Sequence, residues 1–122
     1  MNFKPIIIVL GEPYSIFTEI FFKSIKNKNI KKIKSKIILI GSRKLLQYQM
    51  INLGYKYKIN EIKKNNIDYI SRKNDTINII NTDFKFKKTF DKISTKSQKY
   101  ITVCFDYALK ILKDGNAHGL VN

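Results

Sequence analysis

The sequence predicts an α/β fold in which a parallel sheet is built from β-α-β units and covered by helices on both faces. Two short, continuous apolar runs, Lys4–Leu10 and Lys36–Ile40, are each followed by a glycine, as is typical of strands buried on both faces. A segment with helical periodicity follows each run after a short connection. This alternation of strand and helix is typical of parallel β-α-β units.

Length and composition indicate one globular domain. The 122 residues leave room for one modest core, and a hydrophobic fraction of 43% with 12% aromatic residues argues against wholesale disorder. The single cysteine cannot form an internal disulfide, which favours a reducing compartment. The longest apolar run, Ile6–Leu10, is too short to span a bilayer or to form a signal-peptide core. We therefore expect a cytoplasmic protein without a membrane partner.

The formal net charge of +15 has two explanations. It could form a surface for a polyanion such as a nucleic acid. However, only Arg43 and Arg72 among the 24 basic residues are arginines, and arginine is the side chain that phosphate and base recognition favours. The lysines are scattered along the chain and accompany abundant Ile and Asn, whose codons are also A/T-rich. Genomic composition is therefore the favoured explanation, and nucleic acid is not an expected partner.

Periodicity predicts the elements of the first half. A helix is expected from about Ile16 to Asn27, with Ser15 or Thr18 as its cap. Its predicted apolar face consists of Ile16, Phe17, Ile20, Phe21 and Ile25. The lysine-rich connector Asn27–Lys36 is either a phosphate-binding or targeting patch or, as we favour, a solvated link. A helix from Arg43 to Leu53 is predicted after the second strand, with Ser42 as its cap and Gly54 as its stop.

The second half is less regular. Tyr55–Ile62 and Thr76–Ile80 are strand candidates, whereas Lys63–Asp75 and Thr82–Ile93 are expected to be irregular. A long helix should begin at a cap on Ser94 or Thr95 and end at Asp114 and Gly115. Its apolar face is predicted to hold Tyr100, Ile101, Val103, Cys104, Tyr107, Ala108, Ile111 and Leu112.

The last segment, Ala117–Asn122, is predicted to be a strand with no following element in the sequence. A buried strand normally leads into a turn or a helix. We therefore expect residues 1–122 to form a single, incomplete α/β domain, the amino-terminal portion of a longer protein.

No complete catalytic or metal-binding set is evident. A metal site needs several converging ligands, and the chain has one histidine and one cysteine. His118 is expected to be structural or exposed, and Cys104 to act as a small hydrophobe on its helix. After the first strand the sequence reads GEPYSIF, which matches neither dinucleotide-binding nor P-loop glycine patterns. We therefore predict no catalytic, cofactor-binding or metal-binding residues in this chain.

Gly11, Glu12 and Pro13 are nevertheless candidates for the wall of a substrate crevice. They follow the first strand at its carboxyl end, where parallel α/β proteins bind their ligands. The rigid turn would hold the Glu12 carboxylate at that crevice. The equally weighted alternative is that Glu12 only caps or solvates the turn.

These residues carry a family resemblance. The chain is similar to the 4-hydroxythreonine-4-phosphate dehydrogenases of vitamin B6 biosynthesis, whose opening motif is Gly-(Glu/Asp)-Pro-x-Gly-Ile-Gly-Pro-Glu. Five positions match this motif, namely Gly11, Glu12, Pro13, Ile16 and Glu19. Three depart from it, with Ser15, Phe17 and Thr18 replacing Gly, Gly and Pro. The segment Gln98–Asn122 also resembles the family's helix and strand that precede its Gly-Pro-x-x-Lys loop.

The resemblance implies a two-domain fold related to isocitrate and isopropylmalate dehydrogenases, and a homodimer. It implies NAD-dependent oxidation and decarboxylation of 4-phosphooxy-threonine, a small phosphorylated substrate, in pyridoxal phosphate synthesis. It further implies a divalent metal (Zn, Mg or Co) held by histidines that would lie beyond Asn122. We therefore expect this fragment to be inactive alone and to bind neither NAD nor the metal.

A small basic nucleic-acid-binding module is the alternative from a different class. Aromatic residues alternate with lysines in Tyr55–Lys58 and in Phe84–Phe90, and stacking rings among cations are how single strands are held. The two apolar strands speak against this alternative.

Overall fold

Five parallel strands form one sheet in the computed structural model, which describes residues 4–63, 66 and 69–122. The strands follow one another across the sheet in the order β3-β4-β2-β1-β5. They are β1 (Ile6–Val9), β2 (Ile37–Gly41), β3 (Lys58–Glu61), β4 (Thr76–Asn81) and β5 (Gly119–Val121). All four pairings are parallel, so the carboxyl ends of the strands meet at one edge. The predicted parallel α/β fold is confirmed.

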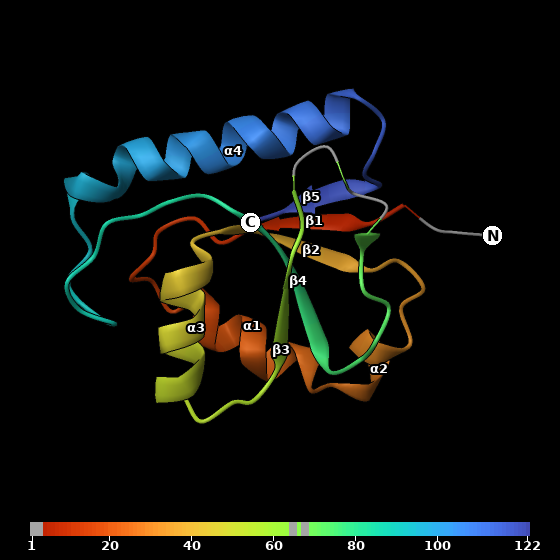
Figure 1. The fold of residues 1–122 in the computed structure, drawn as a ribbon, viewed down its shortest axis with the longest axis horizontal. Coiled ribbons are helices and arrows are strands. Elements are labelled where there is room, and N and C mark those ends of the chain that lie inside the picture. The colour runs from red at the N-terminus through yellow and green to blue at the C-terminus, as the bar shows by residue number, and fades with distance from the viewer. Residues whose placement is uncertain (1–3, 64–65, 67–68) are drawn as a thin grey trace.

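Helices cover both faces of this sheet, as the alternation predicts. In Figure 1, α4 (Gln98–Lys113) lies above the sheet, whereas α1 (Phe17–Ile25) and α3 (Arg43–Asn52) lie below it. Successive side chains of β2 point to opposite faces, so that Ile38 and Ile40 pack on the α4 side and Leu39 packs on the other. Both of these β2 faces are buried, which explains why its sequence is continuously apolar.

The predicted apolar face of α1 is wrong in part. Ile16 precedes the helix and is 71% exposed, and Ile20 is 48% exposed. Phe22, which the prediction left out, is fully buried, and Phe21 is 5% exposed. The helix carries apolar residues on two sides, so its periodicity did not determine which side faces the sheet.

The start and stop signals of α3 and α4 are confirmed, whereas α1 begins after Ile16, and neither Ser15 nor Thr18 occupies its cap position. The Ser42 side chain accepts a hydrogen bond from the backbone N–H of Leu45, as a cap of α3 should. Ser94 does the same for Lys96 at the short 3-10 turn η2 (Thr95–Ser97), which leads into α4. Gly54 and Gly115 have positive φ angles of 84° and 75° just after α3 and α4.

The remaining segments differ from expectation in detail. The lysine-rich connector contains a short exposed helix, α2 (Lys28–Lys31), that was not predicted, with Asn27 as its cap. The strand expected within Tyr55–Ile62 is shorter, as β3. The predicted loop Lys63–Asp75 lies partly outside the described residues, at 64–65 and 67–68. The predicted irregular stretch Thr82–Ile93 has no helix or strand.

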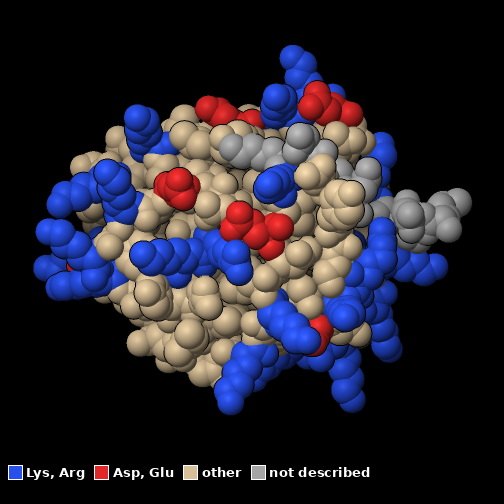
Figure 2. Space-filling model, in the orientation of Figure 1, with Lys and Arg blue, Asp and Glu red and all other residues tan. Residues whose placement is uncertain are grey.

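Basic side chains on the face shown in Figure 2 are not confined to one patch. Lysine and arginine side chains in Figure 2 surround the visible face, with fewer acidic side chains between them. Among the described residues, no helix is long and apolar enough to cross a membrane.

Candidate functional site

The carboxyl edge of the sheet is the natural place for a ligand. The chain leaves β2 toward α3 on one face and leaves β4 through residues 82–94 toward α4 on the other face (Figure 1). Neighbouring strands whose connections diverge in this way open a crevice at their carboxyl ends, where parallel α/β proteins bind ligands. The candidate turn Gly11–Glu12–Pro13 follows β1 at the same edge.

The backbone of this turn requires its glycine. Gly11 has a φ of 70°, and a Cβ atom there would lie 2.9 Å from Nδ2 of Asn122. Asn122 uses the same nitrogen to donate a hydrogen bond to the carbonyl oxygen of Val9, over 3.0 Å. The turn is therefore packed tightly against the residue that follows β5, and Pro13 beside it is buried.

The carboxylate of Glu12 is held from two sides. Oε1 accepts a hydrogen bond from the backbone N–H of Tyr14 (3.3 Å), which is the turn-capping role that the sequence left open. Oε2 accepts a hydrogen bond from the hydroxyl of Ser97 (2.6 Å), a residue that is 2% exposed. This second bond joins the turn to the beginning of α4. The sequence does not single out Ser97, because no local pattern indicates a hydrogen bond between residues 85 positions apart.

Gln49 holds the turn to the 82–94 segment. Its side chain is 2% exposed, and its Nε2 donates to the carbonyl oxygens of Pro13 (2.9 Å) and Thr89 (3.0 Å). The hydroxyl of Tyr14 donates to the carbonyl oxygen of Lys88 (3.0 Å) in the same region. A buried glutamine on α3 thus uses both amide hydrogens to fix two loops at the carboxyl edge. No local pattern around Gln49 predicts this role.

A buried polar cluster lies between α4 and the ends of β2 and β4. The hydroxyl oxygen of Tyr100 accepts a hydrogen bond from the backbone N–H of Ser42 (2.7 Å). Burial, and to a smaller extent Cys104, raises the pKa of Tyr100 well above its ordinary value. Burial likewise raises the pKa of the Cys104 thiol, an effect that the hydroxyls of Thr82 and Tyr100 oppose. A fully buried thiol with a raised pKa packs as a small hydrophobe, which is the role predicted for Cys104.

Two open grooves lie beside the 82–94 segment. The α4-side groove, of about 600 Å³, lies between this segment and α4. The α3-side groove, of about 670 Å³, lies between the segment and α3. Both are lined by Asn81, Asp83, Phe84 and Lys85. Neither is lined by Gly11, Glu12 or Pro13, so the predicted crevice wall lies outside both grooves.

The described residues do not form a site for a metal ion. Within the described part of the chain, no three His, Cys, Asp or Glu side chains converge on one point. His118 is exposed, and its backbone N–H donates to the carbonyl oxygen of Pro5. Cys104 is fully buried against the sheet. A metal used by a longer protein would have to be held by other residues.

Most aromatic residues of the two stretches that suggested a nucleic-acid module pack against other rings of the protein, whereas Phe90 is 39% exposed. The Tyr55 and Tyr57 rings stack on Phe22, with ring centroids 5.1 and 6.1 Å apart. Phe84 packs against Tyr100 at 4.8 Å. These rings stabilise the interior and do not form an open platform for bases.

Solved structures provide the comparison. The chain is similar to a 4-hydroxythreonine-4-phosphate dehydrogenase from Burkholderia phymatum, with a TM-score of 0.84 and 17% identity over 98% of this chain. It is also similar to the 4-hydroxythreonine-4-phosphate dehydrogenase from Klebsiella pneumoniae, with a TM-score of 0.76 and 16% identity over 96% of this chain. In both cases it spans 36% of the solved chain. No protein-family model matches the sequence, and no curated protein matches it. The expected resemblance to this family is confirmed at the level of the fold.

Proposed function

We propose that this chain is part of an NAD-dependent dehydrogenase that oxidises and decarboxylates 4-phosphooxy-threonine in pyridoxal phosphate synthesis. The supporting observation is the coincidence of two independent features. The fold resembles dehydrogenases of that name over nearly the whole chain. The family's opening motif also lies in the turn after β1, at the carboxyl edge of the sheet.

Within this proposal, the turn Gly11–Glu12–Pro13 forms one wall of the substrate crevice. Gly11 permits the close approach of Asn122, and Gln49 and Ser97 fix the turn from two sides. These contacts would keep the crevice wall rigid when a small phosphorylated substrate binds. A pre-organised wall lowers the cost of positioning a substrate.

The chain supplies only part of the chemistry. The proposed reaction needs NAD to accept a hydride and a divalent ion to polarise the substrate. The described residues bring no metal ligands together, so we assign no step of the reaction to them. We propose that the remaining residues, the homodimer partner and the metal belong to a longer protein, and that the 122-residue chain is inactive alone.

The gene beyond codon 122 provides the decisive test. We expect a Gly-Pro pair directly after Asn122, a lysine within a few residues and widely spaced histidines further on. The longer product should reduce NAD with 4-phosphooxy-threonine when a divalent metal is added, and the 122-residue chain should not. A continuation without these residues, or turnover that scales with the concentration of the short chain, would contradict the proposal.

A further inference from the structure

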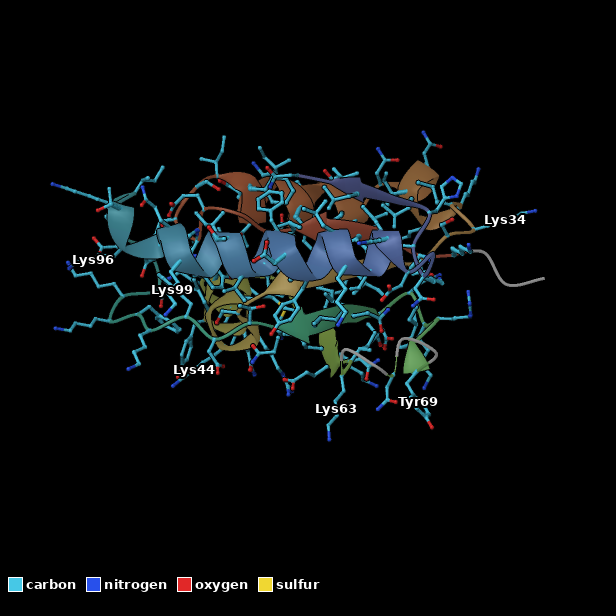
Figure 3. All side chains as sticks on the ribbon, turned by 90° about the horizontal axis from the view of Figure 1, so that it is seen from above. Lys34, Lys44, Lys63, Tyr69, Lys96 and Lys99 are labelled. Carbon is cyan, nitrogen blue, oxygen red and sulfur yellow. The ribbon has the colours of Figure 1, made fainter. Side chains whose placement is uncertain are left out.

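A further groove lies at the amino ends of β2 and β4, at the opposite edge of the sheet from the turn after β1. It is lined by α1 and the lysine-rich connector and, from a distant part of the sequence, by residues within 71–78. Ile37 begins β2 and Thr76 begins β4, and both line the groove. Figure 3 shows Lys34 of the connector at the end of the molecule opposite to Lys96, which precedes α4. This amino-edge groove is therefore separate from the candidate substrate crevice.

The amino-edge groove has a mainly apolar lining. Phe21 and Ile77 belong to the buried core that packs between the sheet and the lower helices. Ile25 and Tyr57 are half-buried, and Ile33 of the connector is exposed. A ligand that covers these side chains removes apolar surface from water, which is favourable in proportion to the area covered.

The main polar side chains of the lining are already hydrogen-bonded within the protein. Asn78 is buried, and its Oδ1 accepts hydrogen bonds from Nδ2 of Asn60 (2.9 Å) and from the backbone N–H of Ser71 (2.9 Å). Its Nδ2 donates to the carbonyl oxygen of Ser71 (2.9 Å). The Thr76 hydroxyl donates to Asp75 (2.9 Å). Apolar contact and charge are therefore what the groove offers to a ligand.

The charge of the lining is positive. Lys31 and Lys36 come from the connector and Lys73 comes from the segment before β4, whereas no Asp or Glu lines the groove. Lys36 is half-buried. Within the described residues, the ion pairs involve other basic side chains, and none includes these three lysines. An anion with an apolar body is thus complementary to the groove in both respects.

We propose that the amino-edge groove binds a short-chain fatty-acid anion, with its carboxylate at the lysines and its aliphatic chain against Ile25 and Ile33. The groove has a volume of about 90 Å³, whereas a cavity of about 150 Å³ holds a benzene molecule. It therefore takes a chain of about four or five carbons, and a longer chain would extend into solvent. No arginine lines the groove, so the bidentate fork that favours phosphate groups is missing there. This inference does not depend on the proposed dehydrogenase activity, because no residue of the Gly11–Pro13 turn lines the groove.

Titration of the isotope-labelled 122-residue chain with sodium hexanoate tests the site. We expect saturable shifts of the backbone amide signals of Ile25, Ile33 and Ile77, with a Kd on the order of 1 mM for so small a ligand. From butyrate to hexanoate the affinity should rise about two- to fourfold per methylene, and octanoate should gain less than about twofold over hexanoate. Hexanol and inorganic phosphate should each bind at least about fivefold more weakly than hexanoate, because each makes only one kind of contact. Equal binding of hexanol, an affinity that is independent of chain length, or shifts spread over all surface lysines would overturn the proposal.

Matched lysine variants separate the groove from diffuse charge. Lys31→Gln/Lys36→Gln removes two lysines that line the groove, and Lys28→Gln/Lys32→Gln removes two exposed lysines of the same connector that do not line it. Both variants change the net charge equally. The groove variant should weaken hexanoate binding about three- to tenfold, whereas the control should change it by less than about twofold. Equal losses in the two variants would show that the anion is held by diffuse charge and not by the groove.

A second matched pair tests the apolar lining. Ile33 and Ile20 are both exposed isoleucines, but only Ile33 lines the groove. Ile33→Ser should weaken hexanoate binding by about fourfold or more, and Ile20→Ser should leave it within about twofold. Unchanged binding in Ile33→Ser, with both variants folded as judged by their amide spectra, would contradict the placement of the aliphatic chain.

Discussion

Glu12 and Ser97 lie 85 positions apart in the sequence and are joined by a hydrogen bond of 2.6 Å between Ser97 Oγ and Glu12 Oε2. The bond ties the turn after the first strand to the start of the longest helix. A hydroxyl is a donor that a half-buried carboxylate needs, because water reaches it poorly. This contact, with the two hydrogen bonds of Gln49, makes the candidate crevice wall a fixed structure.

The Ser97→Ala variant should lower the free energy of unfolding by about 1–2 kcal/mol, because the Glu12 carboxylate loses its buried donor. Urea denaturation followed by circular dichroism measures the change. Thr102→Ala is the matched control on the same helix, since its exposed hydroxyl bonds only to the Gln98 carbonyl one turn earlier. An equal loss of unfolding free energy in the two variants would mean that the Glu12–Ser97 hydrogen bond stabilises the fold no more than the exposed bond of Thr102 does.

Replacement of Gln49 by leucine should loosen two loops at once, the turn after β1 and the 82–94 segment. It leaves the buried carbonyl oxygens of Pro13 and Thr89 without their donor, which should cost about 1–3 kcal/mol. Hydrogen exchange should become faster in the Gly11–Tyr14 turn and near Thr89, and should change little in β5. Gln47→Leu, an exposed position on α3, serves as control. Unchanged exchange in both loops would contradict the assigned role of Gln49.

The Gly41→Ala variant should destabilise the chain by about 1–3 kcal/mol through overpacking. A Cβ atom at this position would lie 2.6 Å from Cδ1 of Leu10 and 2.9 Å from the hydroxyl oxygen of Tyr100. The Tyr100 hydroxyl accepts the backbone N–H of Ser42, so its displacement also weakens a buried hydrogen bond. Gly119→Ala is the control, because nothing lies within 4 Å of its added Cβ. Equal unfolding free energies for the two variants would argue against this close packing.

Stability should fall as pH rises above about 9. Burial raises the pKa of Cys104 above its ordinary value of 9.0, so the unfolded chain loses the thiol proton first. The folded state then binds more protons than the unfolded state, and its stability decreases with pH by at most about 1.4 kcal/mol per unit. The contribution is complete below pH 9 and is lost as pH rises toward the higher folded value. Tyr100 acts in the same direction from its own ordinary value of 10.0.

Denaturation of the parent and of Cys104→Ala at pH 8, 9 and 10 measures this dependence. The unfolding free energy of the variant should fall less steeply between pH 9 and 10. Removal of the buried side chain also lowers its stability at every pH, but this does not affect the slope. The same dependence of unfolding free energy on pH in both proteins would contradict a raised pKa of the Cys104 thiol.

Features encoded in neighbouring residues could be predicted from the sequence. The runs around Ile7 and Ile38 identified buried strands, because a strand covered on both faces has no polar side to display. Ser42 and Gly54 identified the ends of α3, because capping and positive φ depend on a few adjacent residues. The motif at Gly11, Glu12 and Pro13 identified the turn at the carboxyl edge. Its role in substrate binding stays a prediction.

The sequence by itself determined the type, order and approximate limits of most elements, since these depend on local propensity and periodicity. Only the tertiary structure decided which side of α1 faces the sheet, because apolar residues such as Ile20 and Phe22 occupy both sides of that helix. Only the tertiary structure brought Ser97 to Glu12 and the Tyr100 hydroxyl to the Ser42 amide. Contacts between distant residues depend on strand order and on the path of α4 across the sheet, and no local pattern encodes either one.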